Sequence, residues 1–382
     1  MGNILDLPAT NNWLHFAKLG EVWGEILSLT VLGQTMIIVN SLGIAEDLLE
    51  THGANFSDRP VMPMAGELMG FNNVLPLVQY GDRVKQERKL FHQLFGNSAS
   101  IISQFGPLLT SEVHKFLQNV LDEREDVLKL VERFTTRCFS GDVQPATTNF
   151  SRASAPGAFL VDNIPAREYT PSIDDCGGFH TTAKEWSRQL RRTVDTSCEY
   201  VKEQMAAGSI EPSFTARLLE EESHEEYLIK WAAFVIQGGG TDTSAAQIKA
   251  FFRAMSLYPE VQAVAQREID TIVGTDRLPD ISDRERLPYV NGLWKEVLRY
   301  HVTSPIGLPH RARADFIYEP GGGVAPMLIP KDSLVIANIW KIAHDPAIYA
   351  NPIVFDPARF LETNGKAAEL DPASISFRFG RR

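Results

Sequence analysis

A run of glycines followed by an acid and an alcohol is the first pattern in this sequence that could do chemistry. Gly239 and Gly240 precede Asp242 and Thr243 inside the otherwise apolar stretch WAAFVIQGGGTDTSAAQI. Each glycine costs a helix about 1 kcal/mol relative to alanine, so the run indicates a bend or a close approach to the backbone. It is typical of a groove over a cofactor with a proton relay beside it. A polar loop between two helices is the alternative interpretation.

Buried charge is the second kind of pattern. Glu296 and Arg299 stand three residues apart on a predicted helix with apolar neighbours, so they can pair on one face. A buried arginine needs acceptors for all of its donors, which implies a further partner. Arg359 follows in the tight turn FDPARF. The alternative interpretations are a solvated surface bridge for the pair and an ordinary surface loop for the turn.

The last six residues, FRFGRR, fit the start of a Phe-x-x-Gly-x-Arg-x-Cys loop. Alone they would be a frayed basic tail. The four patterns in this order resemble the cytochrome P-450 family of haem-thiolate monooxygenases, in the style of fungal members. Segments such as NFSDRP, GDRVKQERKLFHQLF, LPYVNGLWKEVLRY and GLPHRA extend the resemblance over nearly the whole chain.

The resemblance implies a role for each pattern. Asp242 and Thr243 match the catalytic acid and alcohol that deliver protons, and Gly239 and Gly240 match the glycines over the distal face of the haem. The structural triad that holds the proximal side together is matched by Glu296, Arg299 and Arg359.

Haem is the cofactor that the resemblance implies. Two propionates require several cationic or donor groups. The residues that match the family's cofactor-binding positions are Arg88, His310, Phe377, Gly380 and Arg382. The family's axial cysteine would come two residues after Arg382, so no metal ligand is assigned within the chain.

The activity implied is hydroxylation of an apolar small molecule with O2 and electrons from an NADPH-dependent flavoprotein reductase, as in fungal secondary metabolism. A basic face for an acidic reductase is expected from Lys85, Arg88 and Lys89 with Arg381 and Arg382, and the alternative is that these are ordinary solvated charges. The loop 61–78 is expected to contact substrate, or else to be an apolar core loop. A monomer is expected.

The chain also departs from the family. Val84 stands where a tryptophan often donates to a propionate, and Ala358 stands where an acid is usual. The cysteine and the helix after it are expected to be missing, as is the N-terminal membrane anchor of intact relatives in the endoplasmic reticulum. The alternative function is therefore a catalytically inactive fragment, or a pseudoenzyme that binds an apolar ligand.

The elements expected to position these residues are mostly helices with small β-sheets. Alternating residues at 25–40 predict a hairpin, and Leu334-Val335-Ile336-Ala337 predicts a buried strand. Helical patterns occur at 41–52, 82–95, 104–130, 179–207, 225–257, 259–273 and 289–300. Irregular structure is predicted at 59–80 and 140–175. The whole is predicted to be one cytochrome P-450 domain over 1–382, incomplete at the C-terminus, with an internal deletion near 140–150.

Composition limits the kinds of partner and the cellular compartment that the chain suits. The net charge of −11 argues against nucleic-acid binding, which needs clustered lysine and arginine. Cys138, Cys176 and Cys198 have no paired spacing and suit a reducing compartment. No apolar run is long enough to cross a membrane, and no signal peptide is apparent, which predicts a cytoplasmic or peripheral chain.

Overall fold

The computed structural model is mainly helical with small β-sheets, as the sequence predicts. It describes residues 2–3, 7–8, 10–122, 126–138, 143–155, 158–162, 178–209, 213–221, 225–320, 325–362 and 365–379. The chain divides into two compact units. One, here called the terminal unit, comprises Met1–Asp58 with Ala246–Arg382, and the other, the central unit, comprises Arg59–Ala245.

The larger sheet of the terminal unit has the strand order β1-β2-β6-β3. Strands β1 (Ile26–Val31) and β2 (Gln34–Val39) form the predicted hairpin, whose turn residues Leu32 and Gly33 both have positive φ. Positive φ at both turn positions suits the right-handed twist of a hairpin. Strand β2 pairs in parallel with β6, and β6 pairs in antiparallel fashion with β3.

The remaining strands of the terminal unit are short. Their bounds are β3 (His310–Arg311), β4 (Phe316–Tyr318), β5 (Met327–Ile329) and β6 (Leu334–Ala337), and β4 and β5 form a separate two-stranded sheet. Strand β6 occupies the predicted residues because Val335, Ile336 and Ala337 are almost fully buried.

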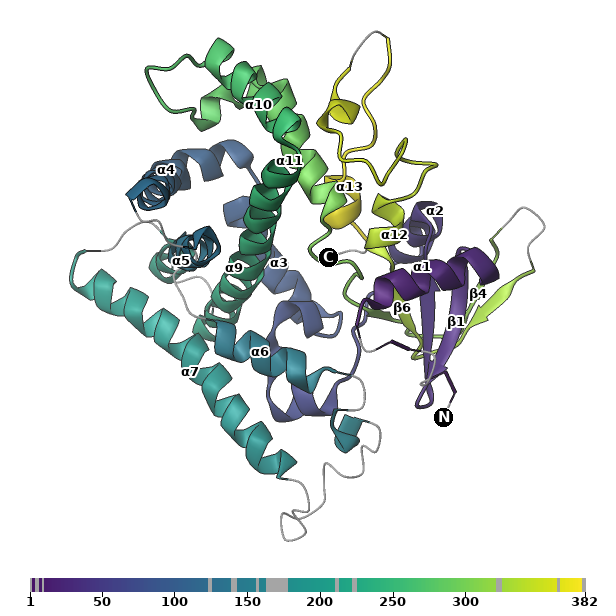
Figure 1. The fold of residues 1–382 in the computed structure, drawn as a ribbon. Helices are drawn as coiled ribbons and strands as arrows, with labels where there is room; N and C mark the ends of the chain where they lie inside the picture. Colours follow the sequence, from purple (N-terminus) through teal and green to yellow (C-terminus); the bar gives the residue numbers. More distant parts are fainter. Residues whose placement is uncertain are drawn as a thin grey trace. The chain divides into compact units, whose positions relative to one another are not determined.

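A helix covers one face of the hairpin. Helix α1 (Asn12–Trp23) packs against β1, and Phe16 joins Leu27, Leu29 and Ile38 in one apolar cluster (Figure 1). The predicted helix at 41–52 forms as α2 (Leu42–Glu46), which continues as a π-helical turn, η2 (Asp47–Thr51). Such π-turns are uncommon and often mark functional positions.

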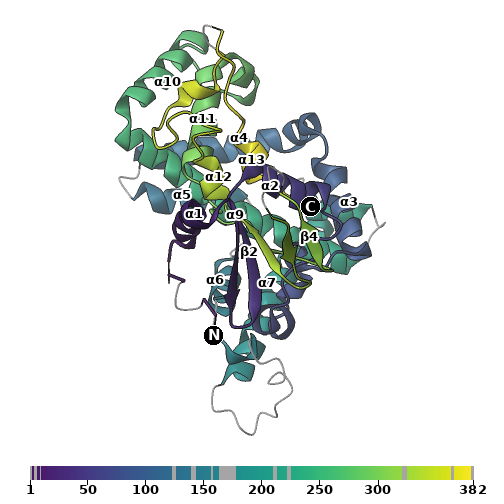
Figure 2. The same ribbon diagram turned by 90° about the vertical axis from the view of Figure 1, so that its right-hand side faces the viewer.

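The helices of the C-terminal part of this unit hold the buried charges. Helices α10 and α11 lie side by side (Figure 2). The bounds are α10 (Pro259–Ile272), η9 (Ile281–Arg286), α11 (Pro288–Tyr300), α12 (Ile339–Ala343), η10 (Pro357–Phe360) and α13 (Ala373–Ser376). Proline at the first position starts α10 and α11, where its missing N–H removes no hydrogen bond.

The regular elements that the structure describes in the central unit are all helical. Its elements are η3 (Pro63–Leu68), η4 (Phe71–Asn73), η5 (Leu75–Leu77), α3 (Asp82–Phe95), α4 (Ser98–Asp122), α5 (Val127–Cys138), α6 (Gln144–Ala153), η6 (Leu160–Asp162), α7 (Phe179–Ala206), α8 (Phe214–Glu220) and α9 (Glu226–Leu257), which continues into the terminal unit. The predicted helix at 104–130 is thus two helices, α4 and α5. The irregular loop predicted at 59–80 contains three short helical turns.

Helix α6 corrects the prediction of irregular structure at 140–175. Its sequence is polar, but Ala146 and Ala153 are buried, and Phe150 packs against a cluster that includes Phe71 and Trp231. Contacts with α7 and η3 stabilise a helix that local propensity does not favour. Residues 163–177 of that range lie outside the described part of the chain.

Candidate functional site

Glu296 and Arg299 form a buried ion pair on α11. Arg299 donates from Nε to Glu296 Oε2 at 2.7 Å and from Nη2 to Glu296 Oε1 at 2.8 Å. Both side chains are fully buried. The three-residue spacing places them on one face of the helix, and the planar guanidinium matches the carboxylate at two points. The pair predicted from the sequence therefore exists inside the protein.

Arg359 completes the predicted set of three. Its Nε lies 3.2 Å from Glu296 Oε2, and its side chain is almost fully buried. One carboxylate with two guanidinium groups would leave a net positive charge in a region that excludes water, which is costly. The cluster therefore needs a second acid.

Glu369 is that acid, and the sequence analysis did not identify it. Arg359 donates from Nη1 to Glu369 Oε2 at 2.7 Å. Burial disfavours the charged form of Glu369, but the hydrogen bond and charge of Arg359, with hydrogen bonds from Ala350 N and Lys366, together outweigh it and hold the pKa of Glu369 below its ordinary value. The cluster of Glu296, Arg299, Arg359 and Glu369 is thus electrically neutral. Counting charges around a buried Glu-Arg-Arg set would have predicted a fourth member.

Main-chain carbonyls accept the remaining guanidinium donors. Arg299 donates from Nη1 to Ala343 O at 3.1 Å and to Pro352 O at 2.7 Å. Both arginines also donate from Nη2 to Val354 O, at 3.3 Å from Arg299 and 2.9 Å from Arg359. These bonds tie α11 to the segment after α12 and to the turn that carries Arg359. The buried charges therefore fix the backbone of this region.

On the central unit, α9 runs through the glycine run without a break. A Cβ built on Gly239 would meet no atom within 4 Å, and the same holds for Gly238. Thr243 lies one turn beyond Gly239 on the same exposed face, and its hydroxyl donates to Gly239 O. A helix is observed, so the alternative of a polar loop is excluded, and one face of that helix is open.

Asp242 takes its partners from a different helix. Gln144 Nε2 on α6 donates to Asp242 Oδ1, and Thr147 Oγ1 donates to Asp242 Oδ2 at 3.5 Å. Thr243 bonds within α9 instead, so the two adjacent residues have separate partners. Gln144 and Thr147 were not singled out in the sequence, because residues 140–175 showed no helical pattern.

Arg88 lies on the exposed side of α3. Its guanidinium has no hydrogen bond or ion pair with the residues that the structure describes. Lys85 and Lys89 are exposed on the same helix, and Lys85 pairs with Asp82 at 2.9 Å. Val84 is fully buried, so the position often held by a propionate-donating tryptophan is a core contact here.

His310 begins β3 in the terminal unit and is buried. Its Nδ1 lies 2.6 Å from Phe56 O, and a carbonyl oxygen only accepts, so Nδ1 carries the proton. In a neutral ring Nε2 is then an acceptor. Donation from Nε2 to an anion requires the doubly protonated ring.

The C-terminal motif is described as far as Phe379. Phe377 is 77% exposed, whereas Phe379 is buried with φ of 80°. Arg378 donates to Glu46 Oε1 at 2.8 Å and to Glu50 Oε1 at 2.9 Å. The α2–η2 segment therefore anchors the start of the predicted loop. Gly380 and Arg382 lie outside the described residues.

Comparison with known proteins decides the family. The family model of Cytochrome P450 matches residues 1–140 and 172–382. The chain belongs to the cytochrome P450 family. It is 41% identical to "Cytochrome P450 monooxygenase claR" of Ampulloclitocybe clavipes, over all of this chain and 73% of that relative. It is 41% identical to "Cytochrome P450 monooxygenase 208" of Postia placenta, over all of this chain and 77% of that relative. It is 33% identical to "O-methylsterigmatocystin oxidoreductase" of Aspergillus flavus, over all of this chain and 75% of that relative.

Haem is the cofactor of cytochromes P450, and features of the central unit fit it. The open face at Gly239 leaves room for a flat group against the backbone of α9. Arg88 offers an exposed guanidinium to a propionate.

Among the described residues no helix is long and apolar enough to cross a membrane.

The described cysteines are thiols in packed surroundings. Burial raises the pKa of Cys138, at the end of α5, to about 11, and burial also raises the pKa of Cys198 on α7. The ligand of a P450 haem is the thiolate form. Neither side chain therefore offers a ready ligand. Cys176 lies outside the described residues.

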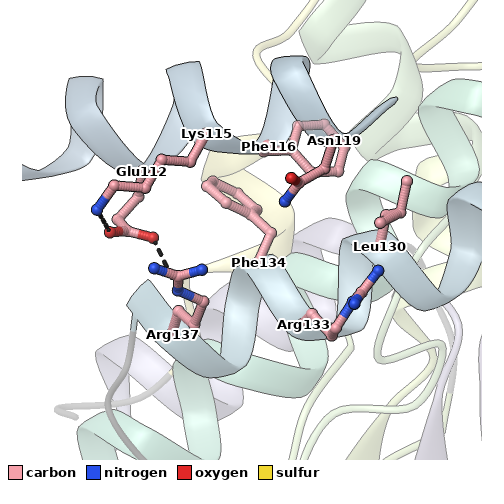
Figure 3. Close-up of a pocket in the computed structure, with 8 residues that line it drawn as sticks. All are labelled: Glu112, Lys115, Phe116, Asn119, Leu130, Arg133, Phe134 and Arg137. Atoms are coloured by element: carbon pink, nitrogen blue, oxygen red, sulfur yellow. Dashed lines mark hydrogen bonds and ion pairs between the residues drawn. The ribbon is translucent and has the colours of Figure 1, made fainter. Parts of the chain in front are cut away.

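A small pocket lies between α4 and α5 (Figure 3). Glu112 pairs there with Lys115 at 2.7 Å and with Arg137 at 3.2 Å, and the rings of Phe116 and Phe134 are 5.0 Å apart. Its volume of about 70 Å³ is far below the 300–1,000 Å³ of typical small-molecule sites. This pocket is too small for haem or a P450 substrate.

Proposed function

We propose that this chain builds the framework of a haem-dependent monooxygenase that hydroxylates an apolar small molecule. O2 is the oxidant, and an NADPH-dependent flavoprotein reductase supplies the electrons. The observation that carries the proposal is the open face of α9. Gly239 leaves the backbone accessible there, and Thr243 lies one turn further along the same face.

The chemistry that bound haem supplies is insertion of one oxygen atom of O2 into a C–H bond. The residues of α9 act around it. Gly239 and Gly240 let a flat group approach the helix because they have no side chain. Thr243 holds a hydroxyl proton against Gly239 O, and turning Oγ1 away from that carbonyl presents the proton to the open face.

Asp242 serves as the proton reservoir in this proposal. Its carboxylate is oriented by Gln144 and Thr147, so it is held on the α6 side of the helix. A proton reaches Thr243 from there through solvent, since the two side chains are not bonded to each other. A carboxylate and a hydroxyl on adjacent residues suit general acid–base transfer.

Cationic and aromatic groups complete the proposed haem contacts. Arg88 and a protonated His310 are each proposed to hold a propionate. Phe377, Gly380 and Arg382 are proposed for the proximal side. Glu296, Arg299 and Arg359 are proposed to shape that side without touching the reacting atoms.

Lys85 and Lys89, the exposed lysines of α3, are proposed to meet the acidic surface of the reductase. The substrate class follows by similarity. One relative is named for oxidation of O-methylsterigmatocystin. We propose an apolar fungal secondary metabolite here.

The test uses the polypeptide translated through the codons after residue 382, loaded with haem and mixed with a fungal NADPH-dependent reductase. Apolar fungal metabolites are incubated with isotopically labelled O2, and products are analysed by mass spectrometry. We expect a product that carries one labelled oxygen atom and requires NADPH. A haem-loaded protein that consumes NADPH but oxygenates no compound would overturn the proposal.

Binding without turnover is the second candidate function, for a polypeptide limited to residues 1–382. It is favoured by the surroundings of Cys138 and Cys198, whose raised pKa disfavours the thiolate form that ligates haem iron. Tight binding of a lipophilic compound without any oxygenated product would support this candidate, and NADPH-dependent turnover by residues 1–382 would exclude it.

A further inference from the structure

A second, larger pocket lies wholly within the central unit, among the turn η3–η4, helix α7 and the first two turns of α9. Its volume is about 470 Å³, which lies within the range of sites that hold small organic ligands. Lys230 of its wall precedes Gly239 by nine residues, or about 14 Å along the helix axis. No residue of the glycine run lines the pocket.

Apolar side chains form one side of this pocket. Met69, Val194 and Trp231 line it, and all three are almost fully buried. The Trp231 ring meets the Phe234 ring edge-on at 6.1 Å, within the main apolar cluster of the unit. Packed in this way, the side chains present a preformed surface for an apolar group.

The turn on the opposite wall is also fixed. Gly70 has φ of 94°, a conformation that suits glycine, and Asn73 donates from Nδ2 to Gly70 O at 2.9 Å. The Tyr227 hydroxyl donates to Asn73 Oδ1, and the guanidinium of Arg83 lies 5.2 Å above the Tyr227 ring. The wall does not have to be ordered by a ligand.

The carboxylates of the pocket already have cationic partners. Lys230 Nζ lies 3.2 Å from Asp195 Oδ1 and 3.0 Å from Glu226 Oε1. Lys202 contacts the other oxygen of Glu226 at 2.5 Å. Hydrogen bonds from Lys202 and Lys230 lower the pKa of Glu226, and the bond to Glu226 raises the pKa of Lys230, so these groups are charged at neutral pH.

Arg191 differs from the other charged residues of the pocket. It lies on α7 one turn before Asp195, and its side chain is exposed. Its guanidinium has no hydrogen bond or ion pair with any residue that the structure describes. The charge left without compensation at the pocket is therefore positive, and a guanidinium binds a carboxylate at two points.

We infer that this pocket binds a small organic carboxylate, with the anionic group on Arg191 and an apolar body against Met69, Val194 and Trp231. The inference goes beyond the proposed monooxygenase activity, because this site requires neither haem nor a reductase. It also differs from the substrate proposal, which needs no charge on the ligand.

The test uses the 382-residue chain without haem. The probes are 4-(trifluoromethyl)benzoate and its neutral analogue 4-(trifluoromethyl)benzamide, which share the apolar body. Their binding is titrated by fluorine NMR and by tryptophan fluorescence. The Trp231→Phe variant identifies the part of the fluorescence change that comes from the pocket. We expect saturable binding of the benzoate and at least several-fold weaker binding of the benzamide.

Arg191→Gln and Arg192→Gln separate the site from general charge attraction. Both arginines are exposed neighbours on α7, but only Arg191 lines the pocket. We expect Arg191→Gln to weaken benzoate binding about tenfold and to leave benzamide binding unchanged, and Arg192→Gln to change neither. Equal binding of the two probes, equal effects of the two variants, or no saturable binding would each overturn the inference. None of these outcomes bears on monooxygenase activity.

Discussion

Arg299 and Glu296 meet through two hydrogen bonds, of 2.7 and 2.8 Å, with neither side chain exposed to solvent. Removing one partner of such a pair leaves a buried charge without compensation, which costs about 3–5 kcal/mol. The remaining guanidinium donors of Arg299 hold carbonyls at Ala343 and Pro352. The pair therefore stabilises the contacts between α11 and the backbone at Ala343 and Pro352.

Replacing Glu296 by Gln should lower the free energy of unfolding by about 3 kcal/mol or more, because Arg299 and Arg359 both lose their shared carboxylate. Urea unfolding followed by circular dichroism measures this. Lys85→Ala is the matched control, since the Lys85–Asp82 pair is exposed and contributes little to stability. Similar losses in the two variants would contradict the burial of the cluster.

Replacing Glu369 by Gln should also destabilise the protein, since Arg359 keeps only one of its two carboxylates. The pKa of Glu369 is held below its ordinary value of 4.5. Its stabilising contribution is thus fully present above pH 4.5 and lost as the pH falls through the lowered pKa. The variant should lose less stability than the wild type between pH 4.5 and 3. The same pH dependence in the variant and the wild type would argue against Glu369 as the fourth member of the cluster.

His344 should make the fold sensitive to mild acid. Burial lowers its pKa to about 4, and it stacks on Trp340 with ring centroids 4.4 Å apart. The unfolded chain binds a proton near pH 6.5, where the folded protein does not, so stability falls as the pH drops from 6.5 towards 4.

The expected contribution of His344 is about 2 kcal/mol between pH 7 and pH 5. His344→Phe keeps an aromatic ring beside Trp340 and removes the titrating group. Its unfolding free energy should vary less over this range than that of the wild type. The same slope in both proteins would show that His344 is not the group responsible.

Gly239→Ala should stabilise the haem-free chain by up to about 1 kcal/mol, because the added methyl group meets no atom and alanine favours the helix. The same methyl group occupies the open face of α9, so haem uptake should fall. Gly43→Ala is the matched control: it is also helical and open, and we expect a stability gain there without loss of haem uptake. Destabilisation by Gly239→Ala would contradict an open face.

Sequence patterns predicted elements whose own residues carry a clear signal. The hairpin at 25–40, the strand at 334–337 and the long helix containing Gly239 and Gly240 were confirmed. The signal is an alternation in the hairpin, a short apolar run in the strand and a long apolar stretch in the helix. Helix α6 was missed because its stability comes from packing of Ala146 and Ala153 against residues far along the chain.

The buried charged residues that follow a recognisable sequence pattern were predicted. Glu369, which belongs to no such pattern, was missed. Glu296 and Arg299 share a helix face, and the family pattern added Arg359. Glu369 lies ten residues after Arg359 in a polar segment with other acids, so only three-dimensional contact identifies it as their partner. Gln144 and Arg378 were missed for the same reason, since their partners Asp242 and Glu50 are distant in sequence.

The reduced carbon-monoxide difference spectrum of residues 1–382, purified with haem supplied, tests the central claim most directly. We propose that residues 1–382 provide the distal face and the buried framework of a cytochrome P450 but no thiolate ligand. Because burial keeps the described cysteines protonated, we predict no thiolate-type band. A thiolate-type band from residues 1–382 alone, lost on replacing Cys138, Cys176 or Cys198 by serine, would contradict the account.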